Sequence, residues 1–309
     1  MELFFTKNLE SCVCCPRNCG TNRLQGKVGV CKIPAEVYIS HAGLHFGEEP
    51  PISGTKGSGT IFFSGCNLRC VFCQNYQISQ EFKREFSVHL TISDLADKML
   101  ELQNLGAHNI NFVSPSHVIY QMADAIVLAK QKGLKIPVVY NSNGYDSVDA
   151  LRKISGLVDI YLPDIKYLET ELALKYSRAK NYADVIPGVL EEMLCQAGHL
   201  ECDENGIAQK GLLVRHLVLP NHVENSKRCL DLIAGLSRYT YVSIMSQYSP
   251  QFKAFKYPDI NRTLSEKEYN EIIDYTEELG LENAFTQELI SQEKCLPDFA
   301  LDTPFNFNL

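Results

Sequence analysis

The chain has 309 residues, of which 45% are apolar and 21% are charged, as in an ordinary globular protein rather than a disordered one. Its formal net charge of −8 argues against a broad nucleic-acid-binding face, because phosphate contacts require clustered Lys and Arg. We therefore expect neither RNA nor DNA as a partner.

The first residues carry no basic region followed by an apolar core, as a secretory signal would, and no stretch approaches the ~20 apolar residues of a membrane helix. We expect a cytoplasmic protein with no membrane partner. Twelve cysteines in that compartment indicate metal ligands or reactive thiols rather than disulfides, and eight of them precede residue 74. The other four have no ligand spacing and are expected to be packing or surface thiols: Cys195, Cys202, Cys229 and Cys295.

Residues 1–50 are rich in cysteine, glycine and proline and show no sustained period, which predicts a separate small segment. Four of their thiols have ligand-like spacing: Cys12, Cys15, Cys19 and Cys31. Four soft ligands in a loop-rich segment suit structural zinc or an auxiliary iron–sulfur cluster, and coordination would stabilise a segment too small for its own core. Cys14 is surplus to this count and could exchange roles with Cys15.

Residues 51–309 are predicted to form the main domain. Short β-branched and apolar runs alternate there with segments of helical period, which favours parallel strands joined by helices. The expected strands cover residues 59–64, 109–114, 136–142, 158–163, 212–219 and 239–245. We predict an α/β fold, a partial (β/α)6 barrel of TIM type with a small Cys-rich N-terminal extension. Its reactive residues should lie at the C-terminal strand ends.

The helices between these strands have recognisable ends. Thr91 and Asp94 have the spacing of a capping box at a helix start, and Gly106 follows as a stop. Further helices are expected over residues 117–132 and 264–279, each ending at a glycine.

Three cysteines follow the first expected strand: Cys66, Cys70 and Cys73, with the aromatic Phe72 just before the last. Thiolates are the usual ligands of iron–sulfur clusters, and three of them leave a four-iron cluster one ligand short. The open iron could hold a second molecule. The alternatives are a zinc site or buried free thiols, since cysteine also packs as a small hydrophobe.

The stretch GCNLRCVFCQN over residues 65–75 resembles the cluster loop of the radical S-adenosylmethionine (SAM) superfamily, and in particular that of pyruvate formate-lyase activating enzymes. The resemblance implies a [4Fe-4S] cluster on the three cysteines and SAM chelated to its open iron. It further implies reductive cleavage of SAM to a 5′-deoxyadenosyl radical that abstracts hydrogen. Asn75, two positions after the last cysteine, becomes a candidate SAM contact.

Two later turns resemble those of the same enzymes. The turn that contains Ser142 and Asn143 is similar to their Thr-Asn-Gly, and implies contacts with the ribose. Asp164 and Lys166 are similar to their Asp-Leu-Lys, and imply contacts with the methionyl group; Arg215 also has a counterpart. Without the resemblance, Asn-Gly is simply a good turn and Asp–Lys a solvated loop pair.

One segment departs from the superfamily pattern. A Gly-Gly-Glu-type segment usually follows the second strand and holds the amino group of SAM, but residues 112–117 read FVSPSH here. Ser114, Ser116 or His117 would have to take its place. His117 is otherwise a residue at a helix start.

The N-terminal cysteines, together with residues 57–79 and 211–223, resemble one branch of proteins similar to pyruvate formate-lyase activating enzymes. The leading reading is hydrogen abstraction from a protein or peptide, such as a backbone glycine of a glycyl-radical enzyme, with a flavodoxin- or ferredoxin-type electron donor. A second reading replaces that substrate with a small metabolite or another peptide. A third is a non-catalytic iron–sulfur or zinc carrier, in which the later turns would face solvent away from the cysteine loop.

Overall fold

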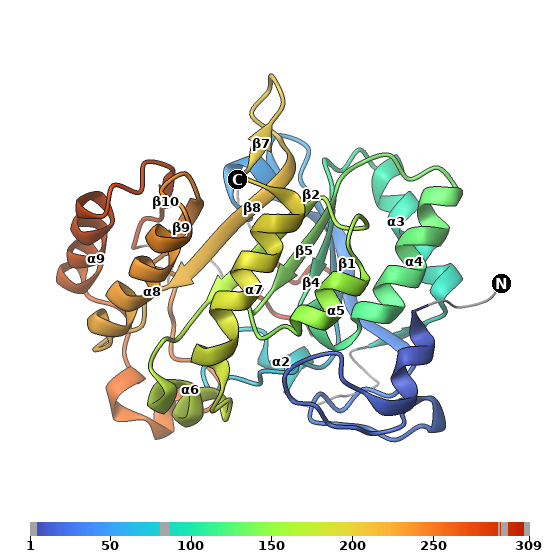
Figure 1. The fold of residues 1–309 in the computed structure, drawn as a ribbon, viewed down its shortest axis with the longest axis horizontal. Helices are drawn as coiled ribbons and strands as arrows, with labels where there is room; N and C mark the ends of the chain where they lie inside the picture. Colours follow the sequence, from blue (N-terminus) through green and yellow to red (C-terminus); the bar gives the residue numbers. More distant parts are fainter. Residues whose placement is uncertain (1–4, 81–86, 290, 292–295, 306–309) are drawn as a thin grey trace.

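The computed structural model describes residues 5–80, 87–289, 291 and 296–305. Within these residues ten strands form one sheet in the order β10-β9-β8-β6-β5-β4-β2-β1-β3, with β7 (Glu201–Cys202) paired to β8 outside this path (Figure 1). The strands from β10 to β2 all pair in parallel. They are β10 (Ala284–Thr286), β9 (Tyr241–Met245), β8 (Ala208–Leu217), β6 (Ile160–Ile165), β5 (Val138–Ser142), β4 (Ile110–Val113) and β2 (Ser58–Phe63).

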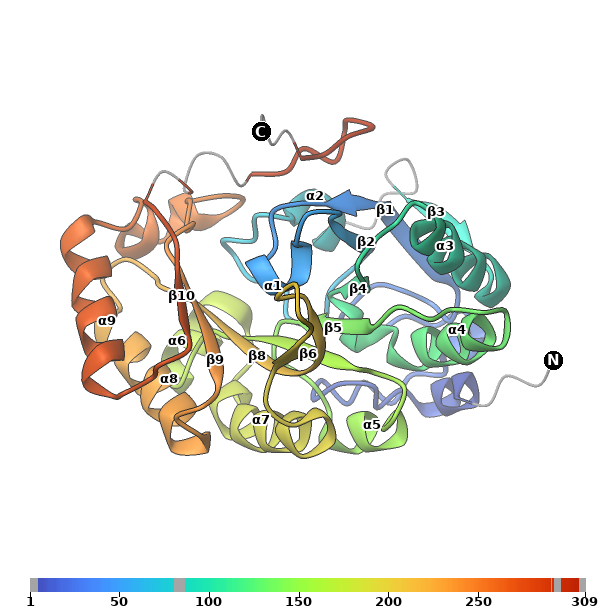
Figure 2. The same ribbon diagram turned by 90° about the horizontal axis from the view of Figure 1, so that it is seen from above.

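The parallel strands curve into an open, partial barrel. Figure 2 shows them as an arc with the long helices on its outer side. Every residue of β2 and β5 is buried, as expected for parallel strands covered on both faces. The six expected strands are all present and the predicted partial barrel is confirmed, with β10 as a further parallel strand at its edge.

The three helices expected from the sequence form over Ile92–Asn104, Ile119–Gln131 and Glu266–Glu278. A capping box formed by Thr91 and Asp94 starts α3, and a second, formed by Ser265 and Glu268, starts α9. The helices are α1 (Pro50–Ser53), α2 (Tyr76–Ser79), α3 (Ile92–Asn104), α4 (Ile119–Gln131), α5 (Val148–Lys153), α6 (Thr170–Ser177), α7 (Tyr182–Ala197), α8 (Val223–Leu236) and α9 (Glu266–Glu278).

Two antiparallel strands, which the sequence did not indicate, extend the sheet beyond β2. They are β1 (Val37–His45) and β3 (Val88–Leu90). Most of β1 is only half-buried, so its sequence lacks the apolar run that marks the parallel strands. Because His45 pairs with Ser58 at the start of β2, the loop after β1 lies at the amino-terminal end of the barrel. The boundary predicted at residue 50 thus falls just after a strand of the core sheet.

The two ends of the chain pack against the barrel. Near the N-terminus, the backbone amides of Phe5 and Thr6 donate hydrogen bonds to the Asp124 carboxylate on α4. Near the C-terminus, Phe299 and Phe305 pack on Phe62 of β2. Figure 2 shows this C-terminal stretch along the open side of the arc, so it covers part of the gap between the two edges.

Candidate functional site

A cavity of about 220 Å³ opens at the carboxyl ends of the parallel strands. Its walls come from the loops or ends of β2, β4, β5, β6, β8 and β9, and its floor includes the loop between β1 and α1. Pro297 and Phe305 of the C-terminal stretch also line it. This is the edge of a TIM-type barrel where reactive side chains gather.

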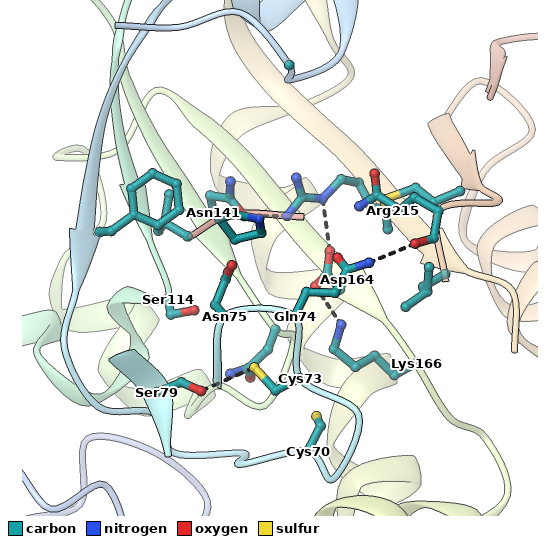
Figure 3. Close-up of a pocket in the computed structure, with 18 of the residues that line it drawn as sticks. Cys70, Cys73, Gln74, Asn75, Ser79, Ser114, Asn141, Asp164, Lys166 and Arg215 are labelled. Carbon is teal, nitrogen blue, oxygen red and sulfur yellow. Dashed lines mark hydrogen bonds and ion pairs between the residues drawn. The ribbon is translucent and has the colours of Figure 1, made fainter. Parts of the chain in front are cut away.

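The three cysteines of the loop after β2 share this cavity: Cys66, Cys70 and Cys73. Cys70 accepts a hydrogen bond from the Ser177 hydroxyl, with Oγ and Sγ 3.1 Å apart, and the Cys73 Sγ lies 3.1 Å from the Ser79 Oγ (Figure 3). Cys66 accepts from the Leu68 amide over 3.4 Å and from the Asn143 amide over 3.5 Å. Donors aimed at sulfur suit thiolates, because a thiolate accepts hydrogen bonds much better than a thiol does.

Burial raises the pKa of Cys73 to about 12, and burial also raises the pKa of Cys70. Both thiols are therefore protonated without a metal, and metal binding would displace those protons. Among the residues that the structure describes, no three thiol, imidazole or carboxylate groups are close enough to hold one metal ion. A single tetrahedral ion needs its sulfurs about 3.8 Å apart, whereas each iron of a cluster takes its own thiolate. The three thiols around one cavity therefore fit a cluster.

The cysteine loop is anchored from the N-terminal segment. The Arg17 side chain donates to the carbonyl oxygens of Asn67, over 2.8 Å, and of Leu68, over 3.1 Å. Arg69 adopts a left-handed backbone conformation with φ of 61° and donates to the Val30 carbonyl over 2.9 Å. The loop conformation thus depends on residues that precede the barrel.

The structure brings most of the predicted SAM contacts to this cavity. Its lining includes Asn75 after the cysteine loop and Ser114 after β4. It also includes Asn143 after β5, Asp164 on β6 and Lys166 just beyond β6. Figure 3 shows Asn75, Ser114, Asp164 and Lys166 between the thiols of Cys70 and Cys73 and the side chains of Asn141 and Arg215. These predictions converge because parallel strands end at one edge of the sheet.

Ser142 is the exception among the predicted contacts. It is absent from the cavity lining, and its hydroxyl donates to the Asp146 carboxylate over 2.6 Å while accepting from the Gly144 amide over 3.1 Å. The preceding residue, Asn141, lines the cavity instead, because side chains alternate between the two faces of a strand. The geometry therefore gives Ser142 a part in shaping the turn.

A buried layer of charges crosses the cavity. Arg215 Nε lies 2.9 Å from Asp164 Oδ1, and Arg215 Nη1 lies 3.0 Å from Glu48 Oε2. Lys166 Nζ lies 2.7 Å from Asp164 Oδ2. Burial opposes ionisation of Asp164, but Lys166 and Arg215 outweigh it and hold the pKa of Asp164 below its ordinary value. Asp164 is thus a carboxylate that fixes two cations in the cavity wall.

The sequence matches the family described as the Radical SAM superfamily over residues 60–193, which extend from β2 into α7. An uncharacterized protein of Methanocaldococcus jannaschii is 33% identical to this chain over 290 residues, covering 91% of this chain and 79% of the relative. The chain belongs to the radical SAM superfamily. Membership implies an enzyme with a [4Fe-4S] cluster and bound SAM.

Three solved structures have similar backbones at low identity. Methylornithine synthase (PylB) is 15% identical with a TM-score of 0.49, covering 79% of this chain and 74% of that chain. A domain of a pyruvate-formate lyase-activating enzyme from Bacteroides vulgatus is 13% identical with a TM-score of 0.39, covering 55% of this chain and 92% of that chain. Streptococcus suis SuiB bound to S-adenosylmethionine is 11% identical with a TM-score of 0.47, covering 76% of this chain and 48% of that chain.

Two carboxylates of this radical SAM cavity were missed from the sequence. Glu48 and Glu49 lie in the loop after β1 and line the cavity floor. The amides of Asn111 and Asn141 donate to Glu48 Oε1 over 3.2 and 3.4 Å, so strands β4 and β5 hold that carboxylate in place. Only the adjacent acidic pair before two prolines could have signalled them, because nothing local shows that this loop enters the barrel.

The N-terminal cysteines surround a second, small cavity of about 10 Å³ beside the radical SAM loop. The predicted ligands all line it, and Cys14 joins them: Cys12, Cys14, Cys15, Cys19 and Cys31. The sulfurs of Cys12 and Cys14 are 3.7 Å apart. At Gly29, an added Cβ would lie 2.7 Å from the Cys19 sulfur, so the backbone needs glycine there.

A buried arginine that the sequence did not single out lies at this second cavity. Arg23 is 1% exposed, and its guanidinium donates to the carbonyls of Pro34 and His117. Its Nη1 lies 3.8 Å from the Cys12 sulfur and 3.9 Å from the Cys14 sulfur. Within the described residues no carboxylate pairs with this cation. A buried cation requires a nearby anion, so the surrounding thiols are the groups that can supply one.

Asn67 joins the two groups of cysteines. It lines the N-terminal cavity, and its side-chain oxygen accepts from the Asn143 amide over 2.9 Å at the wall of the main cavity. Its neighbour Cys66 lines the main cavity. At Gly65, an added Cβ would lie 2.7 Å from the Cys31 carbonyl oxygen, which shows how closely the two loops pack.

The two other candidates for the Gly-Gly-Glu role lie outside the main cavity. His117 Nε2 is 2.8 Å from the Ser64 carbonyl oxygen, and His117 lines the N-terminal cavity. Burial lowers the pKa of His117 to about 4, so the imidazole is neutral. Ser116 is buried and does not line the main cavity. This leaves Ser114 as the one of the three candidates that the structure places there.

The remaining cysteines lie apart from both cavities. Cys195 and Cys202 are exposed and Cys229 is buried in the core, while Cys295 lies outside the described residues.

In the part of the chain that the structure describes, no helix combines the length and the apolar character needed to cross a bilayer.

Proposed function

We propose that this radical SAM enzyme holds its cluster on Cys66, Cys70 and Cys73 and abstracts a hydrogen atom from a protein or peptide. The first candidate is a backbone glycine of a glycyl-radical enzyme. The cluster and SAM, bound together, supply a 5′-deoxyadenosyl radical for this step. The observation that carries the proposal is that the three thiols share one cavity with polar residues from successive strand ends.

The residues of the chain would bind and orient SAM. Lys166 has its ammonium fixed by Asp164 beside the thiol of Cys70, which suits a carboxylate of the ligand. Asn75, Asn143 and Ser114 offer hydrogen-bonding groups from other walls. None of these residues needs to move a proton, because abstraction of a hydrogen atom requires no general base.

Aromatic and aliphatic side chains would keep water from the reacting centre. Phe62 and Phe72 line the cavity beside the thiols, and Phe305 covers its open side. Such a wall prevents side reactions of a reactive intermediate. Phe305 at the cavity is the observation that favours the second candidate substrate, a small metabolite or a short peptide.

The non-catalytic reading receives no support from the geometry. It required the turns after β5 and β6 to face solvent away from the cysteine loop. Asn143 and Asp164 instead lie in the cavity that holds the thiols.

Reduction of the cluster requires an electron donor. We propose a flavodoxin- or ferredoxin-type partner and a cytoplasmic location, where thiols remain reduced.

The proposed chemistry is tested anaerobically. The protein is reconstituted with iron and sulfide, SAM and dithionite are added, and 5′-deoxyadenosine is quantified for wild type, for Cys70→Ala and for a Cys195→Ala control at an exposed thiol. We expect product from wild type and the control and none from Cys70→Ala. Wild type with a verified four-iron cluster and no product, with or without a candidate substrate, would contradict the proposal.

We further propose that the N-terminal thiols bind a second metal centre, zinc or an iron–sulfur cluster. Zinc would require the thiols to come closer together, because no three ligand groups among the described residues can hold one ion as they stand. A tetrathiolate site is anionic with either metal, and Arg23 is positioned to offset that charge. Metal binding would also stabilise a segment that has few helical or sheet hydrogen bonds of its own.

Elemental analysis of a variant that lacks Cys66, Cys70 and Cys73 isolates the second site. We expect about one zinc or about four irons per chain to remain, and Arg23→Met to lower that occupancy. Zinc and iron distinguish the two forms of the centre. A full-length, folded variant without bound metal would contradict the proposal.

A further inference from the structure

The floor of the main cavity holds two adjacent carboxylates that differ in their partners. Glu48 is paired with Arg215 and accepts from the amides of Asn111 and Asn141. Glu49 is 8% exposed, and its Oε2 has no hydrogen-bond partner among the described residues. Glu48 thus belongs to the protein's own charge layer. Glu49 is held by Ser243 through its other oxygen, while its Oε2 lacks a donor.

The charges that line the cavity do not balance. In the described lining, the carboxylates of Glu48, Glu49 and Asp164 face only two cations, Lys166 and Arg215. Both cations are already paired with Asp164 or Glu48. One carboxyl group therefore remains in excess of the cations. Burial raises the pKa of Glu49 against the opposing effect of Arg215, and Glu49 is the member of the set with an oxygen that lacks a donor.

The other basic group nearby cannot supply the missing charge. Burial and the neighbouring Arg215 lower the pKa of His45 to about 4, so its imidazole is neutral near pH 7. An uncompensated buried carboxylate is costly to fold. Without a bound cation the raised pKa of Glu49 limits this cost through protonation, and a cationic ligand would stabilise the ionised form instead.

The position of this carboxylate separates it from the predicted SAM contacts. Glu49 follows β1, whose last residue, His45, pairs with the first residue of β2. The cysteine loop follows the other end of β2, so the thiols and Glu49 lie at opposite ends of the cavity. A molecule that extends from the reacting centre into the barrel would reach Glu49 with its far end.

We infer that the cavity floor binds a cationic group, an ammonium or a guanidinium, of the molecule from which hydrogen is abstracted, and that Glu49 is the residue that selects for it. This inference rests on the proposed function, because it names a property of the same substrate. It favours an amine or a Lys- or Arg-containing peptide over an uncharged substrate.

The test uses the full-length protein reconstituted with iron and sulfide and saturated with SAM. Three probes are titrated by ligand-observed NMR: methylammonium, methylguanidinium and the uncharged N-methylurea. The first two distinguish an ammonium from a guanidinium source. The variant is Glu49→Gln, and the control is Glu224→Gln at an exposed site on α8.

We expect one of the two cations to bind wild type and the control at least tenfold more tightly than N-methylurea, and Glu49→Gln to lose that preference. The thermal midpoint of unloaded Glu49→Gln should rise relative to wild type near pH 7, because folded wild type must either bury the Glu49 charge or take up a proton, and the variant does neither. A rise also shows that the variant is folded.

Other results would overturn the inference. Equal binding of the cations and N-methylurea to wild type, or unchanged cation binding by Glu49→Gln, would show that Glu49 selects no cation. Binding that occurs only without SAM would assign Glu49 to SAM itself.

The 5′-deoxyadenosine assay on the same preparation keeps the two proposals apart. If the protein forms 5′-deoxyadenosine but binds no cation selectively, only this inference is contradicted. Selective cation binding in a preparation that never cleaves SAM contradicts only the proposed chemistry.

Discussion

Replacement of Arg215 by Leu tests whether the buried charge layer holds the cavity together. In wild type, Arg215 contacts Asp164 over 2.9 Å and Glu48 over 3.0 Å, and all three side chains are at most 15% exposed. The Arg215→Leu variant leaves Glu48 with only neutral amide donors and leaves Asp164 with Lys166. Removing one partner from a buried ion pair costs about 3–5 kcal/mol. In a chain of this size that corresponds to a fall in the thermal midpoint of roughly 5–8 °C.

Thermal unfolding of the purified chain measures this effect, and Arg152→Leu is the matched control. Arg152 pairs with Glu192 over 2.8 Å, but its side chain is 62% exposed. An exposed pair contributes about 1 kcal/mol or less, so the control should lose no more than roughly 2 °C.

The pH dependence of the Arg215→Leu defect has a definite sign. Burial already raises the pKa of Glu48 in wild type, and loss of Arg215 raises it further. Asp164 keeps Lys166 but loses one of the two cations that lower its pKa, so that pKa rises as well. The stability difference between variant and wild type is then largest above the folded pKa values of the variant. It shrinks as pH falls through them, because protonation removes the charge that has lost its partner. The difference between variant and wild type should therefore shrink from pH 8 to pH 5. A loss no larger than that of the control, or a difference that does not shrink, would refute the reasoning.

Two further predictions concern the turn after β5. Gly144 has φ of 75°, and an added Cβ would lie 2.3 Å from the Asp164 carbonyl oxygen, so Gly144→Ala should cost about 2–5 kcal/mol in urea unfolding. Gly156→Ala has a similar φ of 80° but no neighbour within 4 Å, and should cost about 1–2 kcal/mol; equal losses would contradict the clash. Ser142→Ala should lower stability by about 1–3 kcal/mol, because Asp146 loses a buried donor, yet leave SAM binding unchanged. A calorimetric loss of SAM affinity in that folded variant would return Ser142 to the ligand site.

The features that were predictable from the sequence are local or periodic. The spacing of Cys66, Cys70 and Cys73 marked a loop whose three thiols line one cavity, and apolar runs with turn residues marked the parallel strands. The capping box of Thr91 and Asp94 started a helix where expected. Such patterns depend on backbone geometry over a few residues, so they can be recognised in the sequence without knowledge of the tertiary structure.

The order of parallel strands also carried information about the site. Because right-handed crossovers return each strand to the same edge, polar residues after successive strands were expected to meet. Asn143, Asp164 and Lys166 do line one cavity with the thiols. The prediction was less reliable at the level of one residue, since a strand turns adjacent side chains to opposite faces and Asn141, not Ser142, faces the cavity.

The sequence by itself determined the cofactor chemistry of this protein, because a short cysteine motif and its flanking strand carry it. Only the tertiary structure decided what faces the substrate. Glu48 pairs with Arg215, which lies 167 positions away in the sequence. Arg23 lies in a separate turn from Cys12, yet the two side chains are in contact. Contacts of that kind follow from the pairing of β1 with β2 and from burial, and neither leaves a periodic trace in the sequence. The Glu49 oxygen that lacks a donor is recognised only once the polar groups around it are known.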